Sequence, residues 1–210
     1  MIKELAKKLS IRKYDSTIRA KRALATKKKI AKALQTLIIE GGTLNSVLIN
    51  DICNKAGVSV ATFYIHFQNK EQALLYIYHD SDDYYTSLRL YEMKPLDGLK
   101  AILHNYLNDI PMDKVNLIRQ LYIAHLTCYD EYFFDQERGL LKRIREQLEK
   151  LNHQGMLKED YSIDEILHKL VNFARGQLYN LAIHEPIIDK NTWNERAKED
   201  MDNYINIFLI

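Results

Sequence analysis

Proline and glycine are so sparse in this sequence that helices can run for long stretches without interruption. The chain has 3 prolines and 7 glycines among 210 residues. Proline is excluded from helix interiors, and glycine and proline together mark the tight turns that β-rich folds need in large numbers. The scarcity of both residues therefore predicts an all-α fold built from long helices.

Apolar residues recur with the helical period along most of the chain. The clearest stripe lies before the glycine pair at residues 41–42 and consists of Leu24, Ile30, Leu34, Leu37 and Ile38. The whole pattern predicts about nine helices, near residues 19–41, 49–57, 59–67, 69–91, 96–109, 113–128, 131–153, 163–184 and 190–208. We divide the chain into a basic N-terminal arm (1–18) that could be part helical, a small helical domain (19–70) and a larger helical domain (71–210).

Charge is distributed unequally between the two ends of the chain. The formal net charge is +2, but residues 1–79 hold 14 Lys and Arg against 5 Asp and Glu, and residues 80–210 hold 16 against 23. A basic N-terminal third on an acidic body predicts a polyanionic partner at one end only. A solvated lysine-rich face is the alternative interpretation.

The segment from Asp51 to Lys70 has the residue order of a helix, a tight turn and a second short helix. Gly57 can adopt the left-handed backbone that such a turn requires. Ser59 can cap the following helix, whose first N–H groups could face a phosphate. Four apolar side chains can form a small shared core: Ile52, Val58, Phe63 and Phe67. Four other side chains stay outside that core and can donate hydrogen bonds to phosphate oxygens: Thr62, Tyr64, His66 and Lys70.

These residues resemble a known family. Ala56-Gly-Val-Ser59 and Thr62-Phe-Tyr-x-His-Phe-x-Asn-Lys-Glu71 look like the signature of the TetR/AcrR, or tetracycline-repressor-like, transcriptional regulators. The apolar run at 30–38 and Gly41 resemble that family's first helix, so the close match covers about residues 28–75. The resemblance implies a three-helix DNA-binding domain with a helix-turn-helix, followed by a helical domain for ligand binding and dimerisation.

The resemblance also implies a role for individual residues. It implies phosphate contacts from Thr62, Tyr64, His66 and Lys70. It implies contacts with base edges from Asn50, Val60, Ala61 and Ile65. Lys27 and Lys28 lie at the start of the main helix of this domain, where we expect phosphate contacts rather than mere solvated charge.

Two positions depart from the family pattern. Leu48 stands where the family usually has Thr or Ser at the start of the second helix, so Ser46 or another group must cap that helix. The base-facing residues of the third helix are apolar, so they can touch thymine methyl groups but cannot form bidentate bonds to guanine or adenine. Asn50, the basic arm or the shape of the DNA must then supply much of the specificity.

The larger domain contains polar and aromatic side chains that could line an effector pocket. Ordinary core packing is the default interpretation of an aromatic stretch, but the resemblance favours a ligand site. The candidate pocket residues are Tyr122, His125, Tyr129, Phe133, Arg175 and Tyr179. Arg175 and Tyr179 could instead be solvated or bridge two subunits.

The last two predicted helices carry long apolar stripes that would be exposed in a monomer. The stripes comprise Leu167, Leu170, Ala174, Leu178, Trp193, Met201, Ile205 and Phe208. We expect these helices to pair across a two-fold axis into a four-helix bundle, which makes the protein a homodimer.

Several other classes of protein are not indicated. The chain has no apolar run of about 20 residues and no secretory signal, so we expect no membrane partner and a cytoplasmic location. Cys53 and Cys128 are too few for a disulfide framework. No nucleophile elbow, phosphate loop or metal motif is present, so we expect no enzyme activity, cofactor or metal. An enzyme using His125 and Cys128 with a tyrosine is a remote alternative.

The sequence therefore predicts a sequence-specific regulator of transcription that binds double-stranded operator DNA. We expect a homodimeric repressor that a small-molecule effector releases from its operator by binding in the C-terminal domain. The alternative is a DNA-binding structural or adaptor protein of the same fold without an effector, which a tightly filled C-terminal core would favour.

Overall fold

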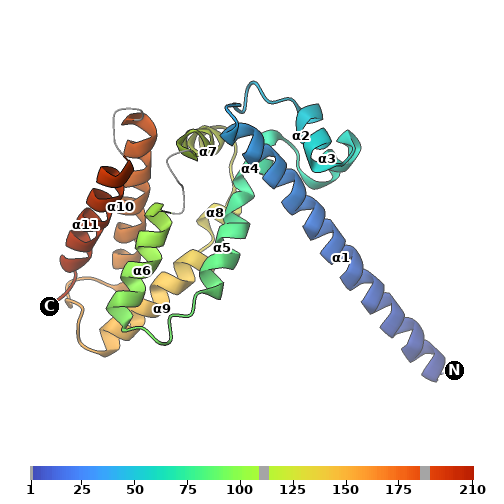
Figure 1. Ribbon diagram of the computed structural model, residues 1–210. Coiled ribbons are helices and arrows are strands. Elements are labelled where there is room, and N and C mark those ends of the chain that lie inside the picture. Colours follow the sequence, from blue (N-terminus) through green and yellow to red (C-terminus); the bar gives the residue numbers. More distant parts are fainter. Residues whose placement is uncertain (1, 109–113, 185–189) are drawn as a thin grey trace. The chain divides into compact units, whose positions relative to one another are not determined.

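The computed structural model describes the backbone of residues 2–108, 114–184 and 190–210 (Figure 1). Side chains are described for residues 18–108, 114–184 and 192–210, so those of the basic arm before Ile18 lie outside this description. The chain divides into two compact units, Met1–Ile77 and Tyr78–Ile210. Within the described residues no helix has the length and apolar character needed to cross a membrane.

The N-terminal unit consists of a long helix and three short ones. Their bounds are α1 (Ile2–Ile39), α2 (Ile49–Ala56), α3 (Val60–His66) and α4 (Lys70–Leu75). The three short helices pack against α1, close to its C-terminal half (Figure 1). Ile30, Leu34 and Ile38 are fully buried there, whereas Leu24 is 48% exposed because it precedes the covered part of the helix.

The first helix is longer than the sequence pattern indicates. Its predicted start is residue 19, but α1 begins at Ile2. Proline and glycine are both absent from residues 1–40, so nothing in the sequence breaks the helix before Gly41. Gly41 then adopts a φ of 105°, which ends α1.

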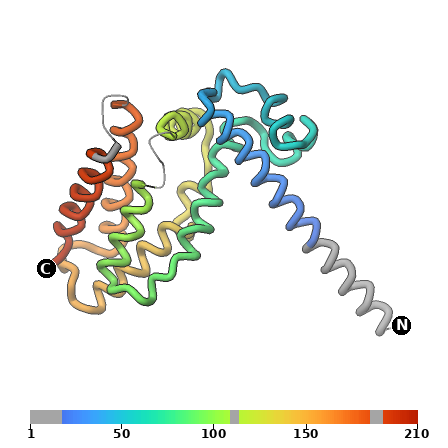
Figure 2. The backbone as a smooth tube through the Cα atoms, viewed as in Figure 1, coloured from blue at the N-terminus to red at the C-terminus, as the bar shows by residue number. Residues whose placement is uncertain are grey.

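The C-terminal unit contains the remaining helices. Their bounds are α5 (Ile77–Ser87), α6 (Pro95–Asn108), α7 (Val115–Thr127), α8 (Glu131–Phe134), α9 (Gly139–His153), α10 (Ile163–His184) and α11 (Lys190–Asn206). Helix α10 packs on α6, α7, α9 and α11, and α6 also packs on α9 and α11. Figure 2 shows α10 and α11 running side by side. One continuous apolar core joins these helices.

The all-α class is confirmed, but the described residues form eleven helices rather than about nine. The predicted helix at 69–91 is divided at Tyr76 into α4 and α5. The predicted helix at 131–153 is divided into α8 and α9, because Asp135 accepts a bond from the Glu137 N–H at 2.9 Å and so closes a local turn. The predicted boundaries at 109 and 113 lie outside the described residues.

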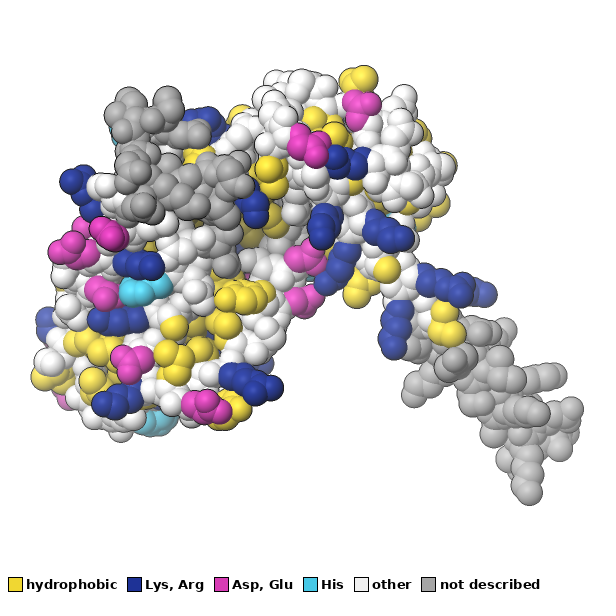
Figure 3. Space-filling model, viewed as in Figure 1, with side chains coloured by type: hydrophobic (Ala, Val, Ile, Leu, Met, Phe, Trp, Pro, Cys, Tyr) yellow, Lys and Arg dark blue, Asp and Glu magenta, His cyan; other side chains and the backbone are white. Residues whose placement is uncertain are grey.

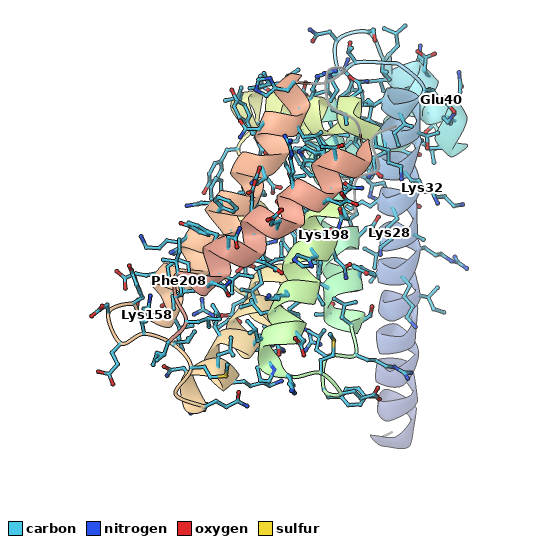
Figure 4. The ribbon with its side chains drawn as sticks, turned by 60° about the vertical axis from the view of Figure 1, so that its left-hand side comes forward. Lys28, Lys32, Glu40, Lys158, Lys198 and Phe208 are labelled. Carbon is cyan, nitrogen blue, oxygen red and sulfur yellow. The ribbon has the colours of Figure 1, made fainter. Side chains whose placement is uncertain are left out.

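The end of the chain is fixed against the loop after α9. Leu157 and Leu209 form an isolated antiparallel bridge, and the Lys158 N–H donates to the Phe208 carbonyl oxygen at 3.0 Å. The Lys158 ammonium also donates to the Ile207 carbonyl oxygen at 2.7 Å. Figure 4 shows Lys158 beside Phe208, just beyond the end of α11. The last residues therefore stabilise the unit rather than hang free.

The side chains that were expected to hold a dimer are instead buried in their own chain. None of the eight exposes more than 6% of its surface: Leu167, Leu170, Ala174, Leu178, Trp193, Met201, Ile205 and Phe208. Helices α6 and α9 cover the apolar faces of α10 and α11. That these side chains form a subunit interface stays a prediction; within this chain they pack into the core, and periodicity indicates that a helix face is covered without identifying what covers it.

Gln147 is a polar residue that is buried in the apolar core. This side chain on α9 is fully buried, and neither its Nε2 nor its Oε1 has a hydrogen-bond partner among the described residues. Replacing it with methionine should raise the free energy of unfolding by about 1–2 kcal/mol, since an unsatisfied amide is removed at nearly constant shape. Urea unfolding followed by the fluorescence of Trp193 measures the change.

The matched control is Glu149→Met, at an exposed position two residues further along α9. This variant should stay within about 0.5 kcal/mol of the parent protein. A lower stability of Gln147→Met would mean that the Gln147 amide has a partner that the packing does not reveal.

Candidate nucleic-acid interface and ligand site

The turn between α2 and α3 has the geometry that its sequence predicts. Gly57 lies in the left-handed region with φ 65° and ψ 41°. The Ser59 side chain accepts a hydrogen bond from the Thr62 N–H at 3.1 Å and so caps α3. Phe63 is fully buried, and Phe67 is 4% exposed with its ring 6.1 Å from that of Phe63. The turn thus fixes α3 on a small aromatic core.

The opposite face of α3 is open to solvent. Val60, Tyr64 and Ile65 are 39%, 55% and 77% exposed, and Ala61 is exposed beside them. Val60 and Tyr64 are four residues apart, as are Ala61 and Ile65, and the two adjacent pairs share one helix face. A short helix with an exposed face, held by a buried hinge, is the arrangement of a helix-turn-helix.

The second helix is capped by a group other than Ser46. Leu48 has no side-chain acceptor, but its N–H donates to the Asp51 carboxylate at 3.3 Å. Ser46 accepts a bond from the Thr43 N–H at 2.8 Å, so it closes the loop before α2 instead of capping the helix. Of the two expected options, Ser46 or another group, the structure has the second, because Asp51 bonds to the first turn of α2. Asn50 follows Leu48 by two residues and is exposed at the start of α2.

Two of the candidate phosphate contacts also brace the N-terminal unit. The Lys70 ammonium donates to the Leu44 carbonyl oxygen and, at 2.8 Å, to that of Val47, in the loop before α2. The Lys27 ammonium lies 5.5 Å and 5.3 Å from the ring centres of Phe67 and Tyr76. Because an ammonium has three donors, most of the capacity of Lys70 is already used.

Other candidate phosphate contacts lie at the surface. Thr62 and His66 are partly exposed on α3, and the Thr62 hydroxyl shares a hydrogen bond with that of Ser59 at 2.9 Å. Lys28 and Lys32 share one side of α1 (Figure 4). Between Ile18 and Ile39, α1 carries seven Lys and Arg and no acidic residue, and Figure 3 shows these cations, in dark blue, along the described part of the helix.

A cluster of aromatic and cationic side chains forms within the C-terminal unit. The His125 Nε2 lies 2.9 Å from the Tyr78 hydroxyl, and the rings of both residues lie within 4.9 Å of that of Phe133. The Arg175 guanidinium lies over Phe133, 4.2 Å from its ring centre. The Tyr122 hydroxyl donates to the Arg175 carbonyl oxygen at 2.7 Å. The cluster thus brings together side chains from four helices, α5, α7, α8 and α10.

The structure sorts the six candidate pocket residues. Tyr122, His125, Phe133 and Arg175 come together, and half-exposed Tyr179 packs edge-on against Tyr122 with ring centres 5.4 Å apart. Tyr129 does not join the cluster: it is 73% exposed and stacks on Phe134.

Sequence reasoning missed three members of this cluster. They are Tyr78, Tyr106 and Arg138. They lie at distant points of the chain, and each is unremarkable in its own helix or loop, so no local signal marks them.

Burial controls the protonation of the cluster. It lowers the pKa of His125 to about 4, and the positive charges of Arg175 and Arg138 act in the same direction. Burial also raises the pKa of Tyr78. At neutral pH both groups are therefore uncharged, and the cationic character of the cluster comes from its arginines alone.

His125 and Cys128 do not form a metal centre. The Cys128 thiol lies 3.7 Å from the Tyr129 carbonyl oxygen, whereas the ring of His125 faces Tyr78. In the part of the chain that the structure describes, His, Cys, Asp and Glu side chains do not gather in groups of three or more that could hold a metal ion.

Comparison with known proteins places this fold. Residues 28–77 match the family model for bacterial regulatory proteins of the tetR family. No curated protein matches the chain. A putative TetR-family transcriptional regulator from Rhodococcus sp. is 20% identical and has a TM-score of 0.63; the match covers 88% of this chain and 98% of the Rhodococcus chain.

Two ligand complexes have a similar fold. FadR from Thermus thermophilus, a TetR-family repressor in complex with lauroyl-CoA, is 19% identical over 83% of this chain and 92% of its own, with a TM-score of 0.62. RolR in complex with resorcinol is 17% identical over 88% of this chain and 89% of its own, with a TM-score of 0.62. Residues 28–77 thus match the tetR-family model, and the chain has the fold of solved TetR-family structures over most of its length.

Proposed function

We propose that this protein represses transcription as a homodimer bound to operator DNA, and that a small-molecule effector in the C-terminal unit releases it. The observation that carries the proposal is the exposed face of α3, held on a buried aromatic core by the Gly57 turn. The basic α1 supplies charge for the DNA backbone.

In this proposal α3 enters the major groove. The exposed apolar side chains of Val60, Ala61 and Ile65 contact thymine methyl groups, and the Asn50 amide reads one base. Thr62, Tyr64 and His66 contact phosphates and set the register. Lys70 acts mainly by holding the loop before α2 in place, and Lys28 contributes charge.

The aromatic cluster supports a ligand site in the C-terminal unit. Relatives of the same fold hold lauroyl-CoA and resorcinol, and the cluster here presents several rings and an arginine. Tyr78 follows directly on Ile77, the last residue of the N-terminal unit. A ligand that displaces Tyr78 would therefore act on the segment that leads out of the DNA-binding unit.

The exposed sides of α7 and α10 support the proposed dimer. Four large apolar side chains remain exposed on these two packed helices: Ile123, Leu126, Tyr179 and Ile183. Gly176 on α10 has open space where a side chain would stand, which allows close approach of another helix. A two-fold dimer would present two copies of α3 to DNA, whose symmetric half-sites repeat about 34 Å apart.

The contacts with DNA can be tested by substitution. Binding selection with the full-length protein and random double-stranded DNA should yield a two-fold symmetric site. Asn50→Ala should relax the preference at one position of each half-site, at a cost of about 1–3 kcal/mol for the preferred base. Tyr64→Phe should weaken binding to all sequences about equally, because a phosphate contact carries no base information.

Asn203→Ala, an exposed asparagine on α11, is the matched control and should leave both the affinity and the selected site unchanged. If selection returned no common sequence, the proposed specific DNA binding would be refuted. If Asn50→Ala left the selected site unaltered, another residue would read that base.

A further inference from the structure

Arg175 is a cation without a counterion at the centre of the aromatic cluster. Its Nε atom is buried and has no hydrogen-bond partner in the described part of the chain, and no described carboxylate forms an ion pair with its guanidinium. Arg138, the other arginine of the cluster, already has a counterion, because its Nε donates to the Asp82 carboxylate at 2.9 Å. The cluster therefore carries one uncompensated positive charge, which an anion would neutralise.

The surroundings of Arg175 define the rest of such a ligand. Its guanidinium lies against the Phe133 ring, an arrangement that leaves the N–H groups at the guanidinium edge available to an oxyanion. Tyr106 lies close enough to Tyr78 and Tyr122 to affect the pKa of both. Flat rings on several sides favour a planar, aromatic body.

We propose that the C-terminal cluster binds an aromatic anion, with its acidic group on Arg175 and its ring among Phe133, Tyr78, Tyr106 and Tyr122. This inference deepens the effector site proposed above and rests on it. Neutral His125 adds no second charge, so a ligand with a single negative charge is matched best. A neutral phenol would not neutralise the positive charge of Arg175, and a cation would be repelled by that charge.

Two fluorescent probes that differ by one group test this proposal. 1-Anilinonaphthalene-8-sulfonate is an aromatic anion, and N-phenyl-1-naphthylamine has the same rings without the sulfonate. Each probe is titrated into the full-length folded protein, and its dissociation constant is read from its emission. We expect saturable binding of the anion at one site per chain, at least 10-fold tighter than that of the neutral probe.

Variants assign the binding to Arg175. Arg175→Gln should lower the affinity for the anionic probe at least 10-fold and change the affinity for the neutral probe less than 2-fold. Arg175→Lys should retain part of the preference for the anionic probe. Lys169→Gln removes one charge from the exposed side of the same helix and should change the affinity for neither probe. Circular dichroism melting of each variant verifies that the fold is intact.

The outcomes separate the proposed site from the proposed release mechanism. Equal affinity for the two probes, absence of binding, or an equal loss of both in Arg175→Gln would overturn the assignment of an aromatic anion. Operator binding is measured with and without the anionic probe as an independent readout. If the probe binds through Arg175 but the protein stays bound to its operator, the anion site is supported and the proposed release of DNA by an effector is refuted.

Discussion

Replacing Asp82 with alanine should destabilise the C-terminal unit by about 3–5 kcal/mol, because the change leaves a buried arginine without its counterion. Asp82 on α5 and Arg138 before α9 expose only 4% and 2% of their side chains. The Arg138 Nε donates to the Asp82 carboxylate at 2.9 Å, and the Leu140 N–H donates to the same carboxylate at 2.8 Å. One carboxylate thus caps α9 and neutralises the arginine.

The Asp82–Arg138 ion pair lies beside Gly139, a position that has no room for a larger residue. A Cβ atom on Gly139 would come within 2.6 Å of the Asp82 carbonyl oxygen, so α5 and the start of α9 are in close contact. The Arg138 guanidinium also lies 5.0 Å from the ring centre of Tyr78. Loss of Asp82 should therefore disturb the aromatic cluster as well as the stability of the unit.

Urea unfolding followed by Trp193, the only tryptophan in the chain, measures this effect in the C-terminal unit. Asp83→Ala changes the adjacent exposed carboxylate and should cost less than about 1 kcal/mol. Adding Arg138→Met to Asp82→Ala should recover part of the loss, because no unpaired charge then remains. Equal stabilities of Asp82→Ala and Asp83→Ala would show that the pair contributes nothing.

The N-terminal unit could be predicted because its signals are local. The turn at Gly57, the cap at Ser59 and the buried ring of Phe63 lie within a few residues of one another, and each requires a particular residue type. Two details escaped prediction because they depend on distant or competing partners. Ser46 bonds to the loop instead of capping α2, and the Lys70 ammonium reaches back to carbonyls more than 20 residues earlier.

The aromatic cluster could be predicted only in part. Tyr122, His125 and Phe133 are close in sequence, and the aromatic stretch drew attention to them. Tyr78 comes from a helix about 45 residues earlier, and Arg138 is unremarkable until Asp82 is placed beside it. Sequence periodicity assigns a residue to a helix face, but the identity of the opposing helix depends on tertiary packing.

Met201→Asp tests what the apolar stripe of α11 does, and we expect it to unfold the C-terminal unit rather than to separate two subunits. Met201 is fully buried, with Ile205 one turn later at 1% exposure. An unpaired carboxylate at this position should cost more than about 4 kcal/mol. Trp193, one of the residues of the same buried face, should shift its emission to longer wavelength as it becomes solvated.

Two controls separate the effect of charge from that of the substitution itself. Met201→Leu keeps the volume and should cost less than about 1.5 kcal/mol. Asn203→Asp places the same carboxylate on the exposed side of the same helix and should leave the protein folded. Sedimentation of Met201→Asp then decides between core and interface. A folded monomer with unshifted Trp193 emission would show that the stripe joins two subunits. Unfolding of the C-terminal unit is the result expected if the stripe is buried within one chain.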